Sequence, residues 1–360
     1  MTNVEGQPSE EWPQAVLHVD MDAFFVNVHL LHHPEDAGLP LAVGGQPDHR
    51  GVIASASYEA RKLGIHSAMP SKRAVHLCPG LKIVGGNWTE IRDSSKKVMN
   101  ILGEYGSIER TSVDEAYVDL SSAADPPSVT KEIQLRVKEE TGLPASVGLA
   151  TSKLVAKVAS DYNKPEGVTI VHPGDEAPFL APQPVRVISG IGPKTAERLS
   201  RIEISTCGQL ASCDLGKLQM LFGRHAESMQ NRAKGIDVRR VSSERGQRKS
   251  ISHERTFSQD VDDLEELESH LVKMASSISN TLKKRNMIAH TIRVKIRWAD
   301  FTTFTRQISK ENGTDDERQI FESAMVMLKR NWQGEQKIRL LGVGVSGLET
   351  PTVRQIDFGF

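Results

Sequence analysis

Two acidic clusters decide how the first half of this chain can fold: His18-Val19-Asp20-Met21-Asp22 and, about ninety residues later, Ser112-Val113-Asp114-Glu115-Ala116. In the first cluster, polar and apolar residues alternate, and this period of two is typical of a β-strand. His18 and Asp20 therefore share one face of the predicted strand. One carboxylate is directed to a fixed place at the end of that strand.

The second acidic cluster lies between two further apolar stretches, Ile108 to Val113 and Ala116 to Leu120. Two short strands joined by a polar pair predict a β-hairpin, with Asp114 and Glu115 at its tip. A hairpin tip beside the end of the first strand would bring these two carboxylates close to Asp20.

This arrangement would place Asp20, Asp114 and Glu115 close together. Carboxylates at such short distances repel one another and raise each other's pKa unless a cation neutralises them. Magnesium is usually held by one or two carboxylates together with substrate phosphates, and a sparse trio suits it. Two such ions can stabilise the attacking and leaving oxygens of a phosphoryl transfer. The residues thus predict a two-metal site, with solvated acidic turns as the alternative.

Composition and length restrict the class of protein. The 360 residues allow two to four domains. No apolar run approaches the roughly eighteen residues of a membrane span, and the polar start from Met1 to Gln14 is unlike a secretory signal. We therefore expect a cytoplasmic protein without a membrane partner. Cys78, Cys207 and Cys213 are expected to be reduced thiols, because their spacing suits neither a disulfide framework nor a zinc site.

The positive charge is unevenly distributed, although the formal net charge is only −1. From Lys283 to Lys310, Asp300 is the one acid among eight Lys and Arg residues. Within this stretch, Arg293, Lys295 and Arg297 alternate with apolar residues and fall on one face of a predicted strand. Such a face could lie along a nucleic-acid backbone. A merely solvated strand face is the alternative.

A glycine-rich turn is expected near the middle of the chain. Gly190 and Gly192 precede Pro193 and Lys194, and proline is favoured at the first position of a helix. This pattern predicts a helix-hairpin-helix whose backbone N–H groups can bind a DNA phosphate without reading sequence. A plain turn between two helices is the alternative.

Further motifs extend the two acidic clusters. They are Ala23-Phe24-Phe25, the stretch from Ser55 to Gly64, Ala68-Met69-Pro70, and the stretch from Lys157 to Gly167. In this order and spacing, the chain resembles the Y-family (translesion) DNA polymerases, and most closely their bacterial DNA polymerase IV branch. The resemblance extends from about Val16 to the last residue.

The resemblance implies a multidomain fold of the right-hand polymerase type, with α/β and α+β parts. It consists of an α/β palm, small fingers, a helical thumb with the helix-hairpin-helix, and an α+β little-finger domain. The expected ranges are a disordered tail at 1–15, palm at 16–34 and 89–175, fingers at 35–88, thumb at 176–237, linker at 238–250, little finger at 251–347 and a tail at 348–360.

By the same resemblance, Asp20 and Asp114 would bind both magnesium ions, with manganese as a possible substitute. Glu115 would help to bind the ion near the primer 3′-hydroxyl, and the Met21 carbonyl would complete a coordination shell.

The resemblance also implies how the deoxynucleoside triphosphate is bound. Tyr58, Arg61 and Lys164 match the family's triphosphate contacts, and Ser55 would add a hydroxyl. Without the family, a surface salt bridge would explain Arg61 equally well.

Phe25 matches the family's steric gate, an aromatic ring that collides with a ribose 2′-hydroxyl. Its neighbour Phe24 would be the core half of the aromatic pair, beside the same substrate pocket. At one position the chain departs from the family, which commonly has Glu after Val28, whereas this chain has His29.

The implied activity is low-fidelity, template-directed DNA synthesis for lesion bypass, without proofreading, by a monomer acting on primer-template DNA. The last residues, including Gln355, Ile356, Phe358 and Phe360, resemble the peptide by which bacterial polymerases bind the sliding clamp. Folding of this tail onto its own domain is the alternative. Two other functions remain open: a catalytically silent DNA scaffold of the same fold, and a palm-type nucleotide cyclase.

Overall fold

The computed structural model describes residues 11–244, 246–334 and 336–351. Contacts divide the chain into two compact units. The first comprises most of the chain up to residue 244. The second comprises the residues from 246 onward, together with the short segments Gly45–Val52 and Pro70–Arg73.

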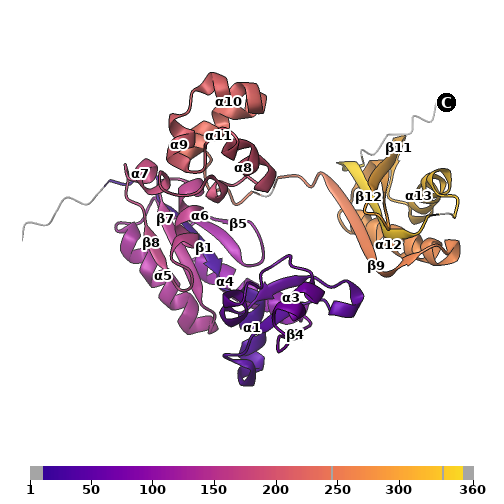
Figure 1. The fold of residues 1–360 in the computed structure, drawn as a ribbon, viewed down its shortest axis with the longest axis horizontal. Coiled ribbons are helices and arrows are strands. Elements are labelled where there is room, and N and C mark those ends of the chain that lie inside the picture. Colours follow the sequence, from indigo (N-terminus) through magenta and orange to yellow (C-terminus); the bar gives the residue numbers. More distant parts are fainter. Residues whose placement is uncertain (1–10, 245, 335, 352–360) are drawn as a thin grey trace, which may run out of the picture. The chain divides into compact units, whose positions relative to one another are not determined.

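A five-stranded sheet with the order β5-β6-β1-β7-β8 forms the centre of the first unit (Figure 1). Its strands are β1 (Val16–Met21), β5 (Ile108–Arg110), β6 (Glu115–Asp119), β7 (Ala145–Ala150) and β8 (Val168–Ile170). The central strand β1 pairs antiparallel with both β6 and β7, and all six of its residues are buried. The strand predicted at the first acidic cluster is confirmed as β1.

The acidic hairpin differs from the prediction in one respect. Strand β6 already begins at Glu115, so Asp114 alone of the two acids lies in the turn. The carbonyl of Glu115 accepts hydrogen bonds from the backbone N–H groups of Thr111 and Ser112, at 3.1 and 3.3 Å. These bonds close the turn before Glu115 and place that residue in the strand ladder.

Four helices pack against this sheet: α1 (Phe24–His32), α4 (Trp88–Gly103), α5 (Pro126–Thr141) and α6 (Lys153–Tyr162). Asp125 is the N-cap of α5, and its carboxylate accepts a hydrogen bond of 3.2 Å from the Ser128 N–H. Pro126 therefore takes the first helical position, which suits its fixed φ angle. Gly142 caps the other end of the helix with a φ of 70°.

A small three-stranded sheet with the order β3-β2-β4 occupies the segment expected to form the fingers. Its elements are β2 (Leu41–Gly44), β3 (Ile53–Ala56), β4 (Lys82–Val84), α2 (Tyr58–Lys62), α3 (Ser71–Leu77) and the 3-10 turns η1 (Pro34–Asp36) and η2 (Pro47–His49). The sequence did not predict β4, because three residues are too few to establish a period of two.

The segment expected to form the thumb is helical. It contains α7 (Glu176–Leu180), η3 (Val185–Val187), α8 (Pro193–Ser200), α9 (Cys207–Ser212), α10 (Leu215–Phe222), η4 (Gly223–His225) and α11 (Ala226–Ala233). Leu199, Leu210 and Leu218 are buried in one cluster with Leu154 and Val155 of α6. The helices thus share a core with the end of the central sheet.

The polar run after α11 is expected to be a linker, and its start is bonded to the first unit. The Asp237 carboxylate accepts a hydrogen bond of 3.1 Å from the N–H of Leu154, at the start of α6. The N–H of Ser242 donates to the Glu109 carboxylate at 3.0 Å.

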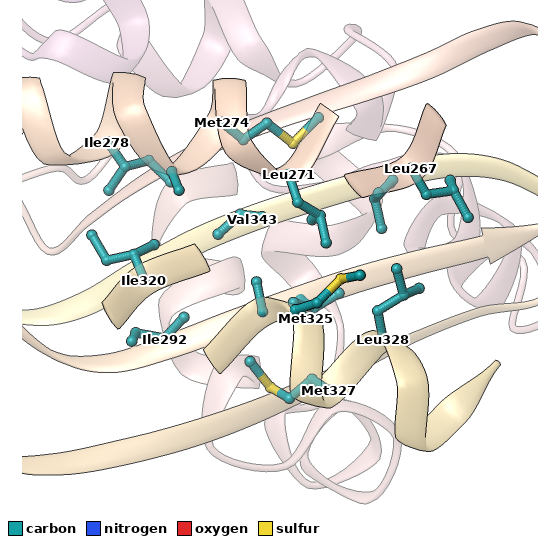
Figure 2. Close-up of a cluster of buried hydrophobic side chains, with 14 of the residues drawn as sticks. Leu267, Leu271, Met274, Ile278, Ile292, Ile320, Met325, Met327, Leu328 and Val343 are labelled. Carbon is teal, nitrogen blue, oxygen red and sulfur yellow. The ribbon is translucent and has the colours of Figure 1, made fainter. Parts of the chain in front are cut away.

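The second unit contains a four-stranded antiparallel sheet with the order β11-β10-β12-β9 and two helices. Its elements are β9 (Ser250–Val261), β10 (Ile288–Trp298), β11 (Thr303–Thr314), β12 (Ile338–Glu349), α12 (Leu264–Lys284) and α13 (Glu317–Asn331). Figure 2 shows how the two helices bury apolar side chains against the sheet, among them Leu271, Ile278, Ile292, Leu328 and Val343.

The strand predicted to carry Arg293, Lys295 and Arg297 is confirmed as part of β10. Strand β9 was not predicted, because it is an edge strand with mostly exposed polar residues and few apolar ones.

The three cysteines are free thiols, as expected. Among the helices of the described segments, none combines the length and the apolar character that crossing a membrane requires.

Candidate active site

The backbone brings the predicted carboxylates to one edge of the central sheet. Asp20 in β1 is paired in register with Glu115 in β6. The N–H of Met21 donates a hydrogen bond of 3.0 Å to the carbonyl of Asp114. Three acidic residues from two distant parts of the sequence thereby become neighbours, because β1 and β6 are adjacent strands.

Two lysines neutralise this edge. The Nζ atom of Lys164 lies 2.7 Å from Oδ1 of Asp20, and the Nζ atom of Lys157 lies 2.8 Å from Oε1 of Glu115. Burial raises the pKa of Asp20 to about 7, and Lys164 opposes that rise. Burial alone would also raise the pKa of Glu115, but the ion pair with Lys157 outweighs it and lowers that pKa. The sequence did not indicate that Lys157 belongs to the site.

The third carboxylate, Asp114, accepts a hydrogen bond from the Ser112 hydroxyl. All three acidic side chains thus have a partner within the protein. In the described part of the chain, no group of three or more His, Cys, Asp and Glu side chains is arranged to hold a metal ion. The donors at this edge are nevertheless all carboxylate oxygens, which are the ligands that hard divalent cations prefer.

Asp22 is a residue of the site that sequence reasoning missed. Its side chain is 1% exposed, and its carboxylate accepts hydrogen bonds from the Tyr58 hydroxyl (2.9 Å), the Ser146 hydroxyl (2.9 and 3.0 Å) and the Glu166 N–H (2.8 Å). Burial, followed by the nearby Asp22 charge, raises the pKa of Tyr58. The signal in the sequence was a second acid directly after a buried strand.

The two phenylalanines after the first cluster differ in burial. Phe24 is 2% exposed and belongs to the core beneath the central sheet, whereas Phe25 is half-buried. The ring of Phe25 lies 5.9 Å from that of Phe24 and 5.6 Å from that of Trp88, which meets it nearly edge-on. Trp88 is 58% exposed and was not singled out from the sequence.

The residues expected to bind the triphosphate lie on and beside α2. The Arg61 guanidinium is 4.7 Å from the centre of the Tyr58 ring, and its Nε donates to the Ala56 carbonyl at 3.0 Å. Ser55 is buried in β3. These contacts place Tyr58 and Arg61 together. Lys164 is not part of this group, because its ammonium forms an ion pair with Asp20.

The departure at His29 has a structural explanation. Its Nε2 lies 2.8 Å from Oδ2 of Asp36, and the Nζ atom of Lys82 lies 2.5 Å from Oδ1 of the same carboxylate. Asp36 is buried, and its pKa is lowered by the hydrogen bond from His29 and then by that from Lys82. A glutamate at position 29 would face this carboxylate with a like charge.

The predicted turn before α8 is present. Gly190 adopts a φ of 96°, Gly192 is the N-cap, and Pro193 is the first residue of the helix. The guanidinium of Arg232 donates to the Ser189 carbonyl at 3.1 Å and so bonds the turn to α11. Lys194 is exposed at the start of α8.

The predicted basic face of β10 is also present. Arg293, Lys295 and Arg297 lie on the face opposite the core, and one of them, Lys295, is paired with an acid. Its Nζ lies 2.8 Å from Glu254 of β9. The sequence could not reveal this pairing, because β9 was not recognised as a strand.

The neighbouring strand β12 keeps the basic face open. Gly342 and Gly344 stand opposite Lys295 and Arg293 in the register. A Cβ atom on Gly342 would lie 2.7 Å from the Glu254 side chain. The two glycines leave a shallow groove of about 200 Å³, lined in part by Arg293 and Lys295.

Known proteins resemble this chain over most of its length. The impB/mucB/samB family matches residues 19–161, and the C-terminal domain of the same family matches residues 248–358. A protein named DNA polymerase IV from Dehalococcoides mccartyi is 41% identical over 337 residues, which cover 92% of this chain and 86% of that protein. The chain belongs to the Y-family DNA polymerases, in the DNA polymerase IV branch.

Other members of the family give the same picture. The DNA polymerase IV of Halorhodospira halophila is 38% identical over 347 residues, covering 95% of this chain and 97% of the relative. That of Bacillus cereus is 38% identical over 352 residues, covering 96% and 85%. A solved Y-family DNA polymerase chimera superposes with a TM-score of 0.82 at 26% identity and covers 92% of this chain and 98% of its own.

Proposed function

We propose that this Y-family polymerase adds deoxynucleotides to a primer 3′-hydroxyl at the sheet edge formed by Asp20, Asp114 and Glu115. The family assignment makes the protein a low-fidelity, template-directed DNA polymerase for translesion synthesis. The observation that carries the site assignment is the register of Asp20 against Glu115, with Asp114 bonded to Met21.

The cation that fits this site best is Mg²⁺, with Mn²⁺ as a substitute. Asp20, Asp114, Glu115 and the Met21 carbonyl offer hard oxygen ligands, which both ions accept. When bound, divalent ions lower the pKa of the attacking hydroxyl and neutralise charge on the phosphates. Lys157 forms an ion pair with Glu115 and so orients that carboxylate.

The nucleotide is assigned to the surface beside α2. Tyr58 and Arg61 are in contact there, and a guanidinium suits phosphate oxygens because it donates two parallel hydrogen bonds. Lys164 supplies a further cation, and Ser55 a hydroxyl. The half-buried ring of Phe25 contacts the rings of Phe24 and Trp88. We assign to Phe25 the role of a steric gate that excludes a ribose 2′-hydroxyl.

The DNA contacts are assigned to two surfaces of different units. The turn containing Gly190, Gly192 and Lys194 presents backbone N–H groups for a phosphate. The open face with Arg293, Lys295 and Arg297 can neutralise a phosphate backbone.

The remaining assignments follow the family. The palm, fingers, thumb and little finger are assigned to the ranges expected from the sequence. We assign the protein to the cytoplasm and expect a monomer. The clamp contact is assigned to Gln355, Ile356, Phe358 and Phe360, which lie outside the described residues.

Primer extension tests the site directly. Asp114→Ala should abolish nucleotide insertion on a primed template, while the affinity for primer-template DNA stays close to that of the wild type. The loss should exceed the roughly 10- to 100-fold effect typical of removing an outer-shell partner of a metal. Asp93→Ala is the matched control, because Asp93 is an exposed acid on α4. Near-normal single-turnover insertion by Asp114→Ala would contradict the assignment.

The same experiment separates the alternatives. A silent scaffold would bind DNA without extending it, and a cyclase would consume nucleotide without a template. Neither is favoured by the family assignment. Extension should also stop on chelation of divalent ions and resume with Mg²⁺ or Mn²⁺.

A further inference from the structure

Phe301 combines two unfavourable features at one position. It lies in the turn between β10 and β11, has a φ of 69°, and leaves 61% of its surface exposed. Bulky residues are rare at positive φ, because the side chain then crowds the backbone. Among the non-glycine residues of positive φ in the described chain, Phe301 is the only aromatic one.

The turn itself does not require a phenylalanine. It is closed by backbone hydrogen bonds from Phe301 N–H to the Trp298 carbonyl (3.1 Å) and from Trp298 N–H to the Thr302 carbonyl (2.9 Å). The Asp300 carboxylate accepts a further bond of 2.8 Å from the Thr302 N–H. Glycine or asparagine could form the same bonds with less strain. The ring must therefore be explained by something other than the turn.

A bulge in β12 directs a cation onto this ring. Arg297 pairs with Leu340 and Trp298 with Ile338, so Arg339 is the extra residue between two pairs. Bulges of this kind redirect a side chain. The Arg339 guanidinium lies 4.2 Å from the centre of the Phe301 ring. Since Phe301 remains largely exposed, the guanidinium leaves much of the ring open.

The cation beside the ring has further charges near it. Burial lowers the pKa of Arg339, Arg50 and then Arg297 lower it further, and Asp260 opposes them. A guanidinium beside an exposed aromatic face is a combination that binds single-stranded nucleic acid, where a base stacks on the ring and a phosphate meets the cation. Inside a duplex both faces of each base are stacked on its neighbours, so apart from the two duplex ends a free base face is offered only by unpaired bases.

We propose that Phe301, supported by Arg339, is a stacking platform for an unpaired base of single-stranded template DNA. The inference rests on the polymerase function only in so far as a template strand is present. It concerns DNA binding and not nucleotide insertion, so the failure of one assignment is distinguishable from the failure of the other.

Equilibrium binding by the full chain tests the platform. The probes are a blunt duplex and the same duplex with a 5′ single-stranded thymidine overhang. Phe301→Ala and Phe301→Asn should each weaken binding to the overhang substrate about tenfold, as expected for the loss of one stacked base. Both should bind the blunt duplex as the wild type does. Phe301→Trp keeps an aromatic face and should retain the overhang affinity.

Comparison of Phe301→Ala with Phe301→Asn separates an effect on binding from an effect on folding. Asparagine tolerates positive φ better than alanine does, so Phe301→Asn should have a higher melting temperature than Phe301→Ala. Both nevertheless lack the ring and should lose the same affinity. If the two variants lose affinity in proportion to their loss of melting temperature, and not equally, the proposal is overturned.

Salt dependence separates the ring from the cation. The slope of log affinity against log salt concentration should be unchanged in Phe301→Asn, because stacking displaces no counterions. Arg339→Gln should reduce that slope by about 1, as for one lost phosphate contact. Unchanged overhang affinity in both truncations, or an equal loss on blunt duplex and overhang, would refute the stacking role.

Discussion

The Tyr58 hydroxyl donates a hydrogen bond of 2.9 Å to Oδ1 of Asp22. Tyr58 begins α2, whereas Asp22 directly follows β1, so the bond joins α2 to the end of the central strand. The same carboxylate also accepts bonds from Ser146 and Glu166. Asp22 therefore fixes three segments around the proposed metal ligands, although it is not assigned as a ligand.

Replacing Asp22 tests this anchoring role. Asp22→Ala should lower the free energy of unfolding by about 2–4 kcal/mol, because it leaves the buried Ser146 hydroxyl without its acceptor and also removes the bonds from Tyr58 and the Glu166 N–H. Tyr58→Phe removes one bond only and should cost about 1 kcal/mol. Urea unfolding measures both. If both variants lose the same free energy of unfolding, the bonds from Ser146 and Glu166 to Asp22 contribute no stability, and the anchoring role is wrong.

Sugar selection should depend on the exposed half of the aromatic pair. Phe25→Ala should raise the efficiency of ribonucleotide insertion relative to deoxynucleotide insertion by at least about tenfold, because a steric clash is lost only for the 2′-hydroxyl. Phe25→Tyr keeps the ring and serves as the control. The ratio of kcat/KM for the two nucleotides is the measurement, and an unchanged ratio in Phe25→Ala would argue against a gate.

Acid stability should depend on His29. The pKa of Asp36 is lowered in the folded chain, first by His29 and then by Lys82. The unfolded chain therefore binds a proton at higher pH than the folded one. The ionised carboxylate contributes stability above its unfolded pKa of about 4, and that contribution is lost as the pH falls through the lower folded value.

Removing the His29 bond should thus shift acid unfolding to higher pH. His29→Leu is the test variant, and His33→Leu is the control, because the His33 ring stacks on that of His29 at 4.4 Å and is bonded to Glu35, not to the Asp36 carboxylate. His29→Glu should destabilise the protein at neutral pH through like charge. An acid midpoint that is the same in His29→Leu and in the wild type would exclude the proposed linkage.

The tail prediction concerns residues outside the described part of the chain. Deleting Gln355 to Phe360 should leave insertion on short templates unchanged, because the proposed site lies elsewhere. It should remove stimulation by a sliding clamp on primed DNA, since a few apolar anchors carry most of the affinity of such peptides. Full stimulation of the truncated protein would show that the clamp binds elsewhere.

The sequence by itself determined the elements whose own residues carry a repeating pattern. Alternation of polar and apolar residues indicated β1 and the basic part of β10. Gly192 and Pro193 marked the start of α8, because each has a backbone preference that acts locally. The acidic clusters and motifs identified the family from residue type and spacing alone.

Only the tertiary structure decided which side chains meet. Asp22 and Ser146 are 124 positions apart, and nothing in either local pattern indicates their bond. The register of Asp20 against Glu115, the pairing of Lys157 with Glu115, and the placement of Arg339 over Phe301 likewise depend on which strands and helices become neighbours. Local preference fixes the conformation of a segment, whereas its partners are chosen by the packing of the whole core.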